Sequence, residues 1–163
     1  MNNPTPIVYA FIDAQNVYQG VIAQGWRYDL RKLRVYLSDK FNVTHALFFI
    51  GQMNGRESFY TAIQSAGFII QFRETSRGSD GKTKGNVDVN LTLMAVDTID
   101  KYDKAILLSA DGDFAPLVRY WANKDKFGAV ISPATKGRTS RFLKRDAKGN
   151  ISYLSDSRAK LER

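Results

Sequence analysis

Short apolar runs alternate with segments of helical periodicity along most of the chain, and this alternation restricts the fold to few classes. Parallel strands need crossover connections, so strands that alternate with helices indicate a parallel sheet with helices on both faces. The expected strands are residues 7–13, 43–50, 68–72, 104–109 and 128–132, with a small edge strand at 151–154. The expected helices are residues 16–23, 30–41 capped by Asp29, 54–66 capped by Asn54, 87–99, 114–123, and a short one after Thr139 or Ser140.

Length and composition indicate one globular domain. The chain has 163 residues, of which 44% are hydrophobic and 25% charged, and it has no cysteine, which excludes disulfides and thiolate metal sites. No apolar run reaches the ~18 residues of a membrane span, and the run before Asp13 is too short for a signal peptide. We expect a cytoplasmic protein that is not bound to a membrane, with a single domain over 1–163, a core at 7–155 and a loose basic tail at 155–163.

Two of the expected strands end in acidic residues. Asp13 ends the first strand, and Asp111 and Asp113 follow the fourth, with Gly112 between them. In open sheets of this kind ligands bind at the carboxyl ends of the strands, where the strand order reverses, and the first and fourth strands usually flank that point. A third acid, Asp88, lies in the first turn of helix 87–99, where it either stabilises the helix dipole or faces the same crevice.

Acids placed side by side repel one another unless a cation lies between them. The alternative is a solvated Asp-Gly-Asp turn, because both residue types favour turns. Carboxylates with the amide of Asn16, and without cysteine or a nearby histidine, suit Mg²⁺ or Mn²⁺ better than Zn²⁺. The only histidine, His45, lies inside an expected strand and is interpreted as structural.

A site of this chemistry predicts metal-dependent hydrolysis of phosphodiesters, since Mg²⁺ is commonly completed by substrate phosphates and by a water that can attack them. Asn16 would orient a ligand, the water or the substrate. No glycine-rich phosphate loop follows the first strand, so binding of a nucleotide cofactor is disfavoured. The expected direct or water-mediated ligands are Asp13, Asp88, Asp111 and Asp113.

The positive charge is concentrated in the last third of the chain. Residues 1–118 hold 12 basic and 12 acidic residues, whereas 119–163 hold 12 basic and 4 acidic ones. This asymmetry favours an anionic polymer as partner, although a solvated basic surface is the alternative. The candidate contacts to a nucleic acid are in the long loop 73–86 and near the last helix: Arg77, Lys82, Lys84, Lys136, Arg138, Arg141 and Lys144. Tyr18, Trp26 and Tyr28 either stack on bases or belong to the core or its rim.

Three segments resemble the signatures of the LabA-like NYN domain, a member of the PIN-like superfamily of metal-dependent nucleases. They are residues 11–16 (FIDAQN), 84–91 (KGNVDVNL, with Asp97 beyond) and 108–117 (LSADGDFAPL). The resemblance covers residues 7–155. It implies a Rossmann-like three-layer sandwich with about five parallel strands in the order 3-2-1-4-5, an acidic Mg²⁺ pocket, and cleavage of single-stranded or structured RNA.

The resemblance also implies roles for individual residues. The four acids and Asn16 match its site positions, Ser109 would hydrogen bond within the acidic site, and Ser140 would cap the last helix beside it. Asp97 matches a recurrent family position, but it lies nine residues beyond Asp88, about half a turn away in azimuth, and is assigned a structural role. Ala14 and Ala110 stand where the family often has glycine.

The sequence is compatible with three functions. The favoured one is a metal-dependent endoribonuclease. The second is a non-catalytic RNA-binding or regulatory module on the same fold. The third is a small-molecule phosphatase with an aspartate nucleophile, and the long basic loop favours a polymer substrate over it. A homodimer stays an open alternative, because many small domains of this kind are dimers but no exposed apolar stripe requires one.

Overall fold

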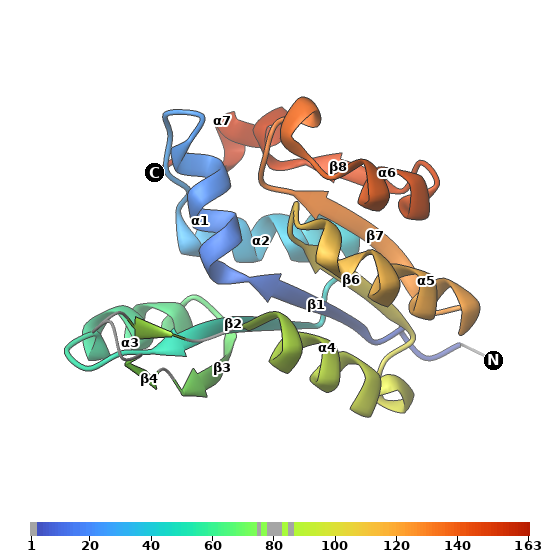
Figure 1. Cartoon of the computed structure of the whole chain (residues 1–163), viewed down its shortest axis with the longest axis horizontal. Coiled ribbons are helices and arrows are strands. Elements are labelled where there is room, and N and C mark those ends of the chain that lie inside the picture. The colour runs from blue at the N-terminus through green and yellow to red at the C-terminus, as the bar shows by residue number, and fades with distance from the viewer. Residues whose placement is uncertain (1–2, 75, 78–82, 85–86) are drawn as a thin grey trace.

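The structure, a computed structural model, describes residues 3–74, 76–77, 83–84 and 87–163 (Figure 1). A six-stranded parallel sheet forms its centre, in the order β3-β2-β1-β6-β7-β8. The strands of the sheet are β1 (Val8–Asp13), β2 (His45–Gln52), β3 (Ile69–Glu74), β6 (Lys104–Leu108), β7 (Phe127–Ser132) and β8 (Ile151–Tyr153). The helices are α1 (Ala14–Ile22), α2 (Leu30–Phe41), α3 (Glu57–Ser65), α4 (Val87–Asp97), α5 (Ala115–Asn123), α6 (Arg141–Ala147) and α7 (Arg158–Leu161), with the short turns η1 (Ile99–Lys101), η2 (Gly112–Phe114), η3 (Lys136–Arg138) and η4 (Leu154–Ser157).

Strand β1 lies between β2 and β6 and is buried on both faces of the sheet. Ile12 is in register with Phe48 of β2 and with Leu108 of β6. Successive side chains of a strand point to opposite faces, so Phe11 and Ile12 enter two different cores. This explains why the strand reads as a continuous apolar run and not as an alternating one.

Each face of the sheet is covered by its own set of helices (Figure 1). Helices α1, α2, α3 and α7 pack on the face of Ile12, through residues such as Val17, Leu33 and Ile63. Helices α4, α5 and α6 pack on the face of Phe11, through residues such as Leu91 and Trp121. The predicted three-layer α/β architecture is therefore confirmed.

The predicted strand order is confirmed and is extended by one strand. The first five strands have the order 3-2-1-4-5, and the sixth, β8, pairs in parallel with β7 between Val130–Ile151 and Ser132–Tyr153. Residues 151–154 were expected as a small edge strand, and three of them form it. The count of about five strands is therefore low by one.

The expected N-cap of helix 54–66 is wrong. Helix α3 begins at Glu57 after Arg56, which makes no side-chain cap hydrogen bond, and not after Asn54. Gly55 has a φ of 81°, in the left-handed region, so the backbone turns there before the helix can begin. Asp29, by contrast, caps α2 as predicted and accepts a hydrogen bond from the backbone N–H of Lys32 at 2.9 Å.

The expected loose tail is also wrong. Residues 154–161 form η4 and α7, and Leu161 is fully buried in the core on the α1–α2 face. Its carbonyl oxygen accepts a hydrogen bond from the backbone N–H of Asp29 at 2.8 Å, and Glu162 forms a β-bridge with Tyr28. One apolar residue among polar neighbours gives no periodic signal, which is why this packing is not visible in the sequence.

The expected long loop contains regular structure in its described part. Strand β3 continues to Glu74, and two short strands, β4 (Ser76–Arg77) and β5 (Thr83–Lys84), pair antiparallel. Lys82, a candidate RNA contact, lies outside the described residues, and the side chains of Arg77 and Lys84 are likewise not described. In the part of the chain that is described, no helix is long and apolar enough to cross a membrane.

Candidate metal centre

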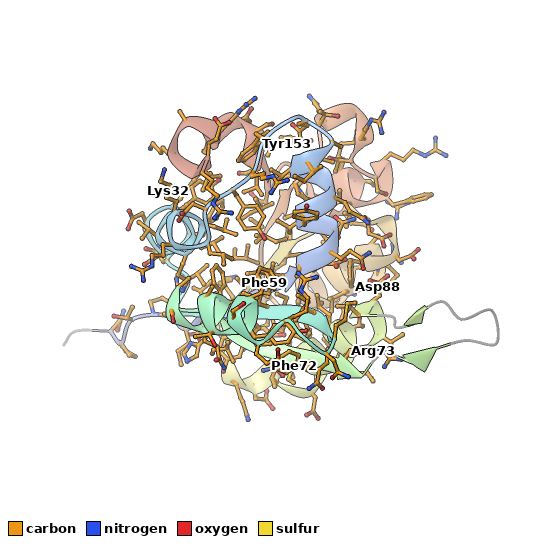
Figure 2. All side chains as sticks on the ribbon, turned by 90° about the vertical axis from the view of Figure 1, so that its left-hand side faces the viewer. Lys32, Phe59, Phe72, Arg73, Asp88 and Tyr153 are labelled. Atoms are coloured by element: carbon orange, nitrogen blue, oxygen red, sulfur yellow. The ribbon has the colours of Figure 1, made fainter. Side chains whose placement is uncertain are left out.

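Three chain segments bring acids to the carboxyl edge of the sheet. Asp13 ends β1, Asp111 lies three residues beyond the end of the neighbouring strand β6, and Asp88 is in the first turn of α4. Figure 2 looks onto this edge of the molecule and shows Asp88 on it. The start of α4 thus faces the same crevice as the strand ends, which is the condition that a shared role for Asp88 requires.

Three of the four acids converge closely. Asp88, Asp111 and Asp113 each offer a carboxylate oxygen, and these oxygens lie within 4.8 Å of one another. Oxygens around an Mg²⁺ ion at about 2.1 Å lie roughly 3.0–4.2 Å apart, so a small closure of the three groups fits such an ion. An all-carboxylate donor set is also the chemistry that hard cations prefer. The three residues could therefore hold a metal ion.

Asp13 lies behind this triad. Its side chain is only 6% exposed, and it caps α1 by accepting a hydrogen bond from the backbone N–H of Asn16 at 3.4 Å. Burial, followed by the negative charge of Asp88, raises the pKa of Asp13 to about 6, with a further contribution from Asp111. It is outside the group of three oxygens but within their electrostatic reach.

Repulsion between neighbouring carboxylates also acts on Asp88. Burial raises the pKa of Asp88 to about 6, and the charge of Asp111, a hydrogen bond with Asp111 and the charge of Asp113 act in the same direction. The carboxyl groups of Asp88 and Asp111 are therefore close enough to share a proton. A cation at this position would replace the proton and relieve the repulsion.

Asn16 connects the two strand ends. Its Oδ1 accepts hydrogen bonds from the backbone N–H of Ala110 at 2.9 Å and from the hydroxyl of Ser109 at 3.3 Å. The Oγ of the fully buried Ser109 in turn accepts a hydrogen bond from the backbone N–H of Asp111 at 3.1 Å. Asn16 thus orients the loop that carries Asp111, which agrees with the first of the three roles that the sequence left open, the orientation of a ligand.

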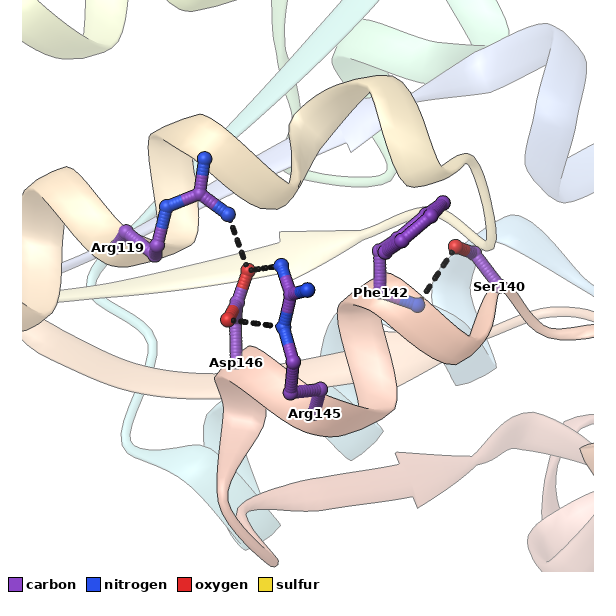
Figure 3. A network of polar contacts seen from close by, with 5 residues as sticks. All are labelled: Arg119, Ser140, Phe142, Arg145 and Asp146. Carbon is purple, nitrogen blue, oxygen red and sulfur yellow. Dashed lines mark hydrogen bonds and ion pairs between the residues drawn. The ribbon is translucent and has the colours of Figure 1, made fainter.

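The other side of this loop rests on α6. The backbone N–H of Ser140 donates to the carbonyl oxygen of Ala110 at 3.2 Å, and its Oγ caps α6 by accepting from the N–H of Phe142 at 3.1 Å (Figure 3). A Cβ on Gly112 would collide with the Oγ of Ser140 and would lie 3.1 Å from its Cβ. Only glycine fits at this close approach, which explains the small residue between the two acids.

Helix α6 is itself fixed to α5. Asp146 accepts hydrogen bonds from Arg119 of α5 at 2.9 Å and from Arg145 at 2.9 and 3.1 Å (Figure 3). Arg145, followed by Arg119, holds the pKa of Asp146 below its usual range. The end of α6 is therefore fixed against α5, while the hydrogen bond from Ser140 to Ala110 holds its start beside the acidic loop.

The described basic candidates lie around the start of α6. Lys136 and Arg138 are exposed on η3, and Arg141 is exposed in the first turn of α6. Lys144 is half-buried and donates from Nζ to the carbonyl oxygen of Lys136 at 3.0 Å. Ser140 links this region to the acidic loop, so these residues border the candidate centre.

The remaining sequence candidates separate clearly. Trp26 is 3% exposed and belongs to the core, so it does not stack on a base, whereas Tyr18 is 51% exposed. His45 begins β2 and is in register with Tyr9, four residues before Asp13, at the opposite edge of the sheet. Asp97 ends α4, about 13 Å from Asp88 along the helix axis at 1.5 Å per residue.

A doubly wound parallel sheet with acids converging at its switch point defines a Rossmann-like domain with a candidate metal site. The chain matches the family model of the NYN domain over residues 8–154, and it therefore belongs to the NYN domain family. It is also similar to the Low amplitude and bright protein LabA of Synechococcus elongatus. The two are 26% identical, with 94% of this chain and 86% of that protein covered.

A solved structure shares the whole fold. It is the crystal structure of a protein of unknown function from Vibrio parahaemolyticus, which matches with a TM-score of 0.80 and 25% sequence identity. The match covers 100% of this chain and 99% of that chain. This match confirms the fold, whereas the resemblance to LabA-like NYN domains is confirmed by the family model and by the similarity to LabA.

Proposed function

We propose that this protein is a metal-dependent endoribonuclease that hydrolyses RNA phosphodiester bonds at the acidic cluster, with Mg²⁺ or Mn²⁺ as its cofactor. The observation that carries the proposal is the convergence of Asp88, Asp111 and Asp113 at the carboxyl edge of the sheet, with Asp13 directly behind them. Membership of a nuclease-like family supports the same activity.

The residues of the chain have separate tasks in this proposal. Asp88, Asp111 and Asp113 would hold the ion directly, and Asp13 would act through a water molecule or through its charge. When bound, the ion supplies an activated water and neutralises charge that develops on the phosphate. Asn16 and Ser109 keep Asp111 in place through their hydrogen bonds, and the hydrogen bond from Ser140 to Ala110 limits movement of the loop.

RNA as the substrate is supported by the basic residues on the border of the site. Lys136 and Arg138 are exposed on η3 and Arg141 is exposed at the start of α6, and such residues position a nucleic acid by contacts to its phosphates. We include Lys144, Arg77, Lys82 and Lys84 in the proposed RNA contacts. The acids attract the metal ion, and the surrounding lysine and arginine side chains reduce the repulsion between these acids and the RNA backbone.

The test is cleavage of a labelled single-stranded RNA in Mn²⁺, in Mg²⁺ and in EDTA, with the wild type and with Asp111→Asn. We expect cleavage that requires the ion and falls by at least about 100-fold in the variant, since catalysis by an activated water depends on ligand geometry. Asp39→Asn is the matched control, because Asp39 is exposed on α2 and outside the cluster.

The outcomes separate the alternatives. No cleavage in either ion, together with retained RNA binding that weakens with salt, would identify a non-catalytic RNA-binding module. Cleavage that survives both EDTA and Asp111→Asn would place the activity in a contaminant or at another site. Cleavage of a circular RNA, which has no free ends, would establish endonucleolytic action directly.

A further inference from the structure

A cavity of about 880 Å³ lies beside the acidic cluster. Its walls come from α1, from the segment before α2, from the end of β2 and from α3. Ala14, which follows Asp13 directly, and Val87, which precedes Asp88 directly, both line it. Pockets that hold small organic ligands measure roughly 300–1,000 Å³, so this one accommodates a group of nucleotide size.

Exposed arginines surround the cavity. Five of them line it: Arg27, Arg31, Arg56, Arg73 and Arg163. Within the described residues, none of the five forms an ion pair with an acidic side chain. Among the side chains of the described lining residues the single acid is Asp29, which is engaged in capping α2. Unpaired guanidinium groups bind phosphate oxygens in a bidentate manner, so the cavity is suited to an anion.

The interior of the cavity is apolar and aromatic. Tyr18 is 51% exposed and Met53 is 47% exposed, so both present apolar surface to a ligand. The guanidinium of Arg56 lies over the ring of Phe59, 4.9 Å from its centroid, and adds a second flat group. Figure 2 shows Phe59, Arg73 and Asp88 on the same side of the molecule. Flat aromatic and guanidinium surfaces stack on nucleobases without regard to sequence.

The sheet order places three features in a row along its carboxyl edge. The cavity lies at the end of β2, the acids lie at the ends of β1 and β6, and the basic start of α6 follows β7. Since β2, β1, β6 and β7 are successive neighbours in the sheet, a polymer that crosses this edge would meet cavity, acids and basic segment in this order.

We propose that the cavity binds an unpaired nucleotide of the RNA, with its base against Tyr18 and Phe59 and its phosphates on Arg56 and Arg73. The inference rests on the proposed function in that it takes RNA as the ligand, and it adds a nucleotide subsite outside the acidic cluster. A base inside a duplex cannot enter such a cavity without being unpaired. A free nucleotide carries the same chemical groups, so the test must distinguish it from a strand.

The first experiment measures binding of a short fluorescent oligoribonucleotide by anisotropy, in EDTA and in the Asp111→Asn background, so that no cleavage is needed. We expect Tyr18→Ala to weaken binding by about 5- to 160-fold, the range found when a stacking aromatic is removed. Arg56→Glu should weaken binding and flatten its salt dependence, by about 0.7 in the logarithmic slope for each phosphate that the protein no longer neutralises. Lys101→Glu is the matched control, since Lys101 is exposed on η1, just before β6 begins at the opposite edge.

Two further variants of the experiment test the chemistry of the ligand. Tyr18→Leu keeps an apolar side chain but removes the ring, so retained affinity in this variant would overturn base stacking. Equal affinity for a double-stranded RNA, or for uridine monophosphate, would overturn the assignment to an unpaired nucleotide within a strand. We expect the single strand to bind more tightly than either ligand.

Photo-crosslinking tests the position without any substitution. An oligoribonucleotide that contains 4-thiouridine should crosslink to peptides with Tyr18, Met53 or Phe59. Crosslinks confined to η3 and α6 would overturn the inference. If binding depends on the cavity residues but wild type shows no cleavage in Mn²⁺, the proposed nuclease activity is rejected and the nucleotide subsite is retained. If wild type cleaves RNA but neither Tyr18→Ala nor Arg56→Glu weakens binding, the subsite is rejected and the nuclease activity is retained.

Discussion

The amide oxygen of Asn16 accepts a hydrogen bond from the backbone N–H of Ala110 at 2.9 Å, between residues that are 94 positions apart in the chain. This bond and the adjacent one from Ser109 hold the loop of Asp111 and Asp113 against the end of β1. The geometry of the acidic cluster therefore depends on a neutral side chain as much as on the acids.

Replacing Asn16 by alanine should destabilise the protein and weaken metal binding. The variant leaves the N–H of Ala110 and the hydroxyl of Ser109 without their acceptor, at a total cost of about 1–3 kcal/mol, because both hydrogen bonds are only partly buried. Affinity for Mn²⁺ should fall by about 10- to 100-fold, as for other groups that orient metal ligands. Urea unfolding and calorimetric titration measure the two effects. Gln19→Ala, an exposed change on the same helix, is the control, and equal behaviour of the two variants would contradict the assigned role.

The free energy of unfolding should decrease as pH rises from about 4 to 7 in EDTA. The pKa values of Asp13 and Asp88 are raised from 3.8 to about 6, so in this window the folded protein holds protons that the unfolded chain has released. The destabilisation is absent below pH 3.8, the pKa in the unfolded chain, and is complete above about pH 6, the pKa in the folded protein. Urea unfolding at a series of pH values measures this slope.

Asp13→Asn provides the internal check on that slope. Asparagine keeps an oxygen that can cap α1 but has no charge, so the variant should be more stable than wild type at neutral pH and should lose part of the slope. Asp39→Asn, outside the cluster, should keep the slope of the wild type. A parallel pair of wild-type and Asp13→Asn curves would exclude a raised pKa at Asp13.

Mn²⁺ or Mg²⁺ should raise the Tm at neutral pH, because an ion that binds only the folded state stabilises it by about 2.7 kcal/mol at a concentration of 100 times Kd. The rise should be smaller near pH 5, since protons compete with the ion for Asp88 and Asp13. Thermal unfolding with and without the ion measures it. Asp111→Asn should abolish the shift, and an unchanged shift in that variant would place the ion elsewhere.

Gly112→Ala should destabilise the protein by about 1–3 kcal/mol, because the new methyl group collides with Ser140. Ser140→Gly removes the side-chain atoms that the new methyl group would contact, and glycine at an N-cap costs only a few tenths of a kcal/mol. The double variant should therefore recover part of the stability lost in Gly112→Ala. Gly137→Ala is the control, because a Cβ there has no atom within 4 Å. Strict additivity of the two changes would show that the collision is relieved by other movements.

Leu161→Ala should cost about 2–5 kcal/mol, the range for a leucine fully buried in a core. The neighbouring exposed change Lys160→Ala should stay within about 0.5 kcal/mol of wild type. Urea unfolding of the two variants compares them directly. A small effect of Leu161→Ala would mean that α7 is detached in solution.

The sequence predicts most of the sheet, because its strands are buried on both faces and read as uninterrupted apolar runs. Val8–Asp13 and Lys104–Leu108 are of this kind, and the acids at their ends indicate the site without further information. The sequence alone does not assign Asp88 to the site, since its position in a first helical turn is equally typical of a residue that interacts with the helix dipole. The structure brings Asp88 to Asp111 and Asp113, so it faces the crevice, which its position in a first helical turn does not predict.

The remaining features depend on contacts between distant segments, which no local pattern encodes. The oxygen of Asn16 could face a ligand or a loop, and only the packing of β1 beside β6 turns it to Ala110. Leu161 and the arginines of the cavity are isolated in sequence among polar residues, and folding alone brings them together. Asn54 is a favourable cap residue by type, but the left-handed turn at Gly55 delays the helix.

The central position of β1 has a consequence for the order of events during protein synthesis. Its partner β6 and the acids behind it are made about 90 residues later, and Ser140 later still. The nascent chain therefore carries Asp13 and Asn16 with one edge of β1 open until residue 113 has left the ribosome. The acidic cluster cannot form before residues 111–113 are available, and its loop has no support from Ser140 until that residue follows, so a nascent chain that ends earlier has no candidate metal centre.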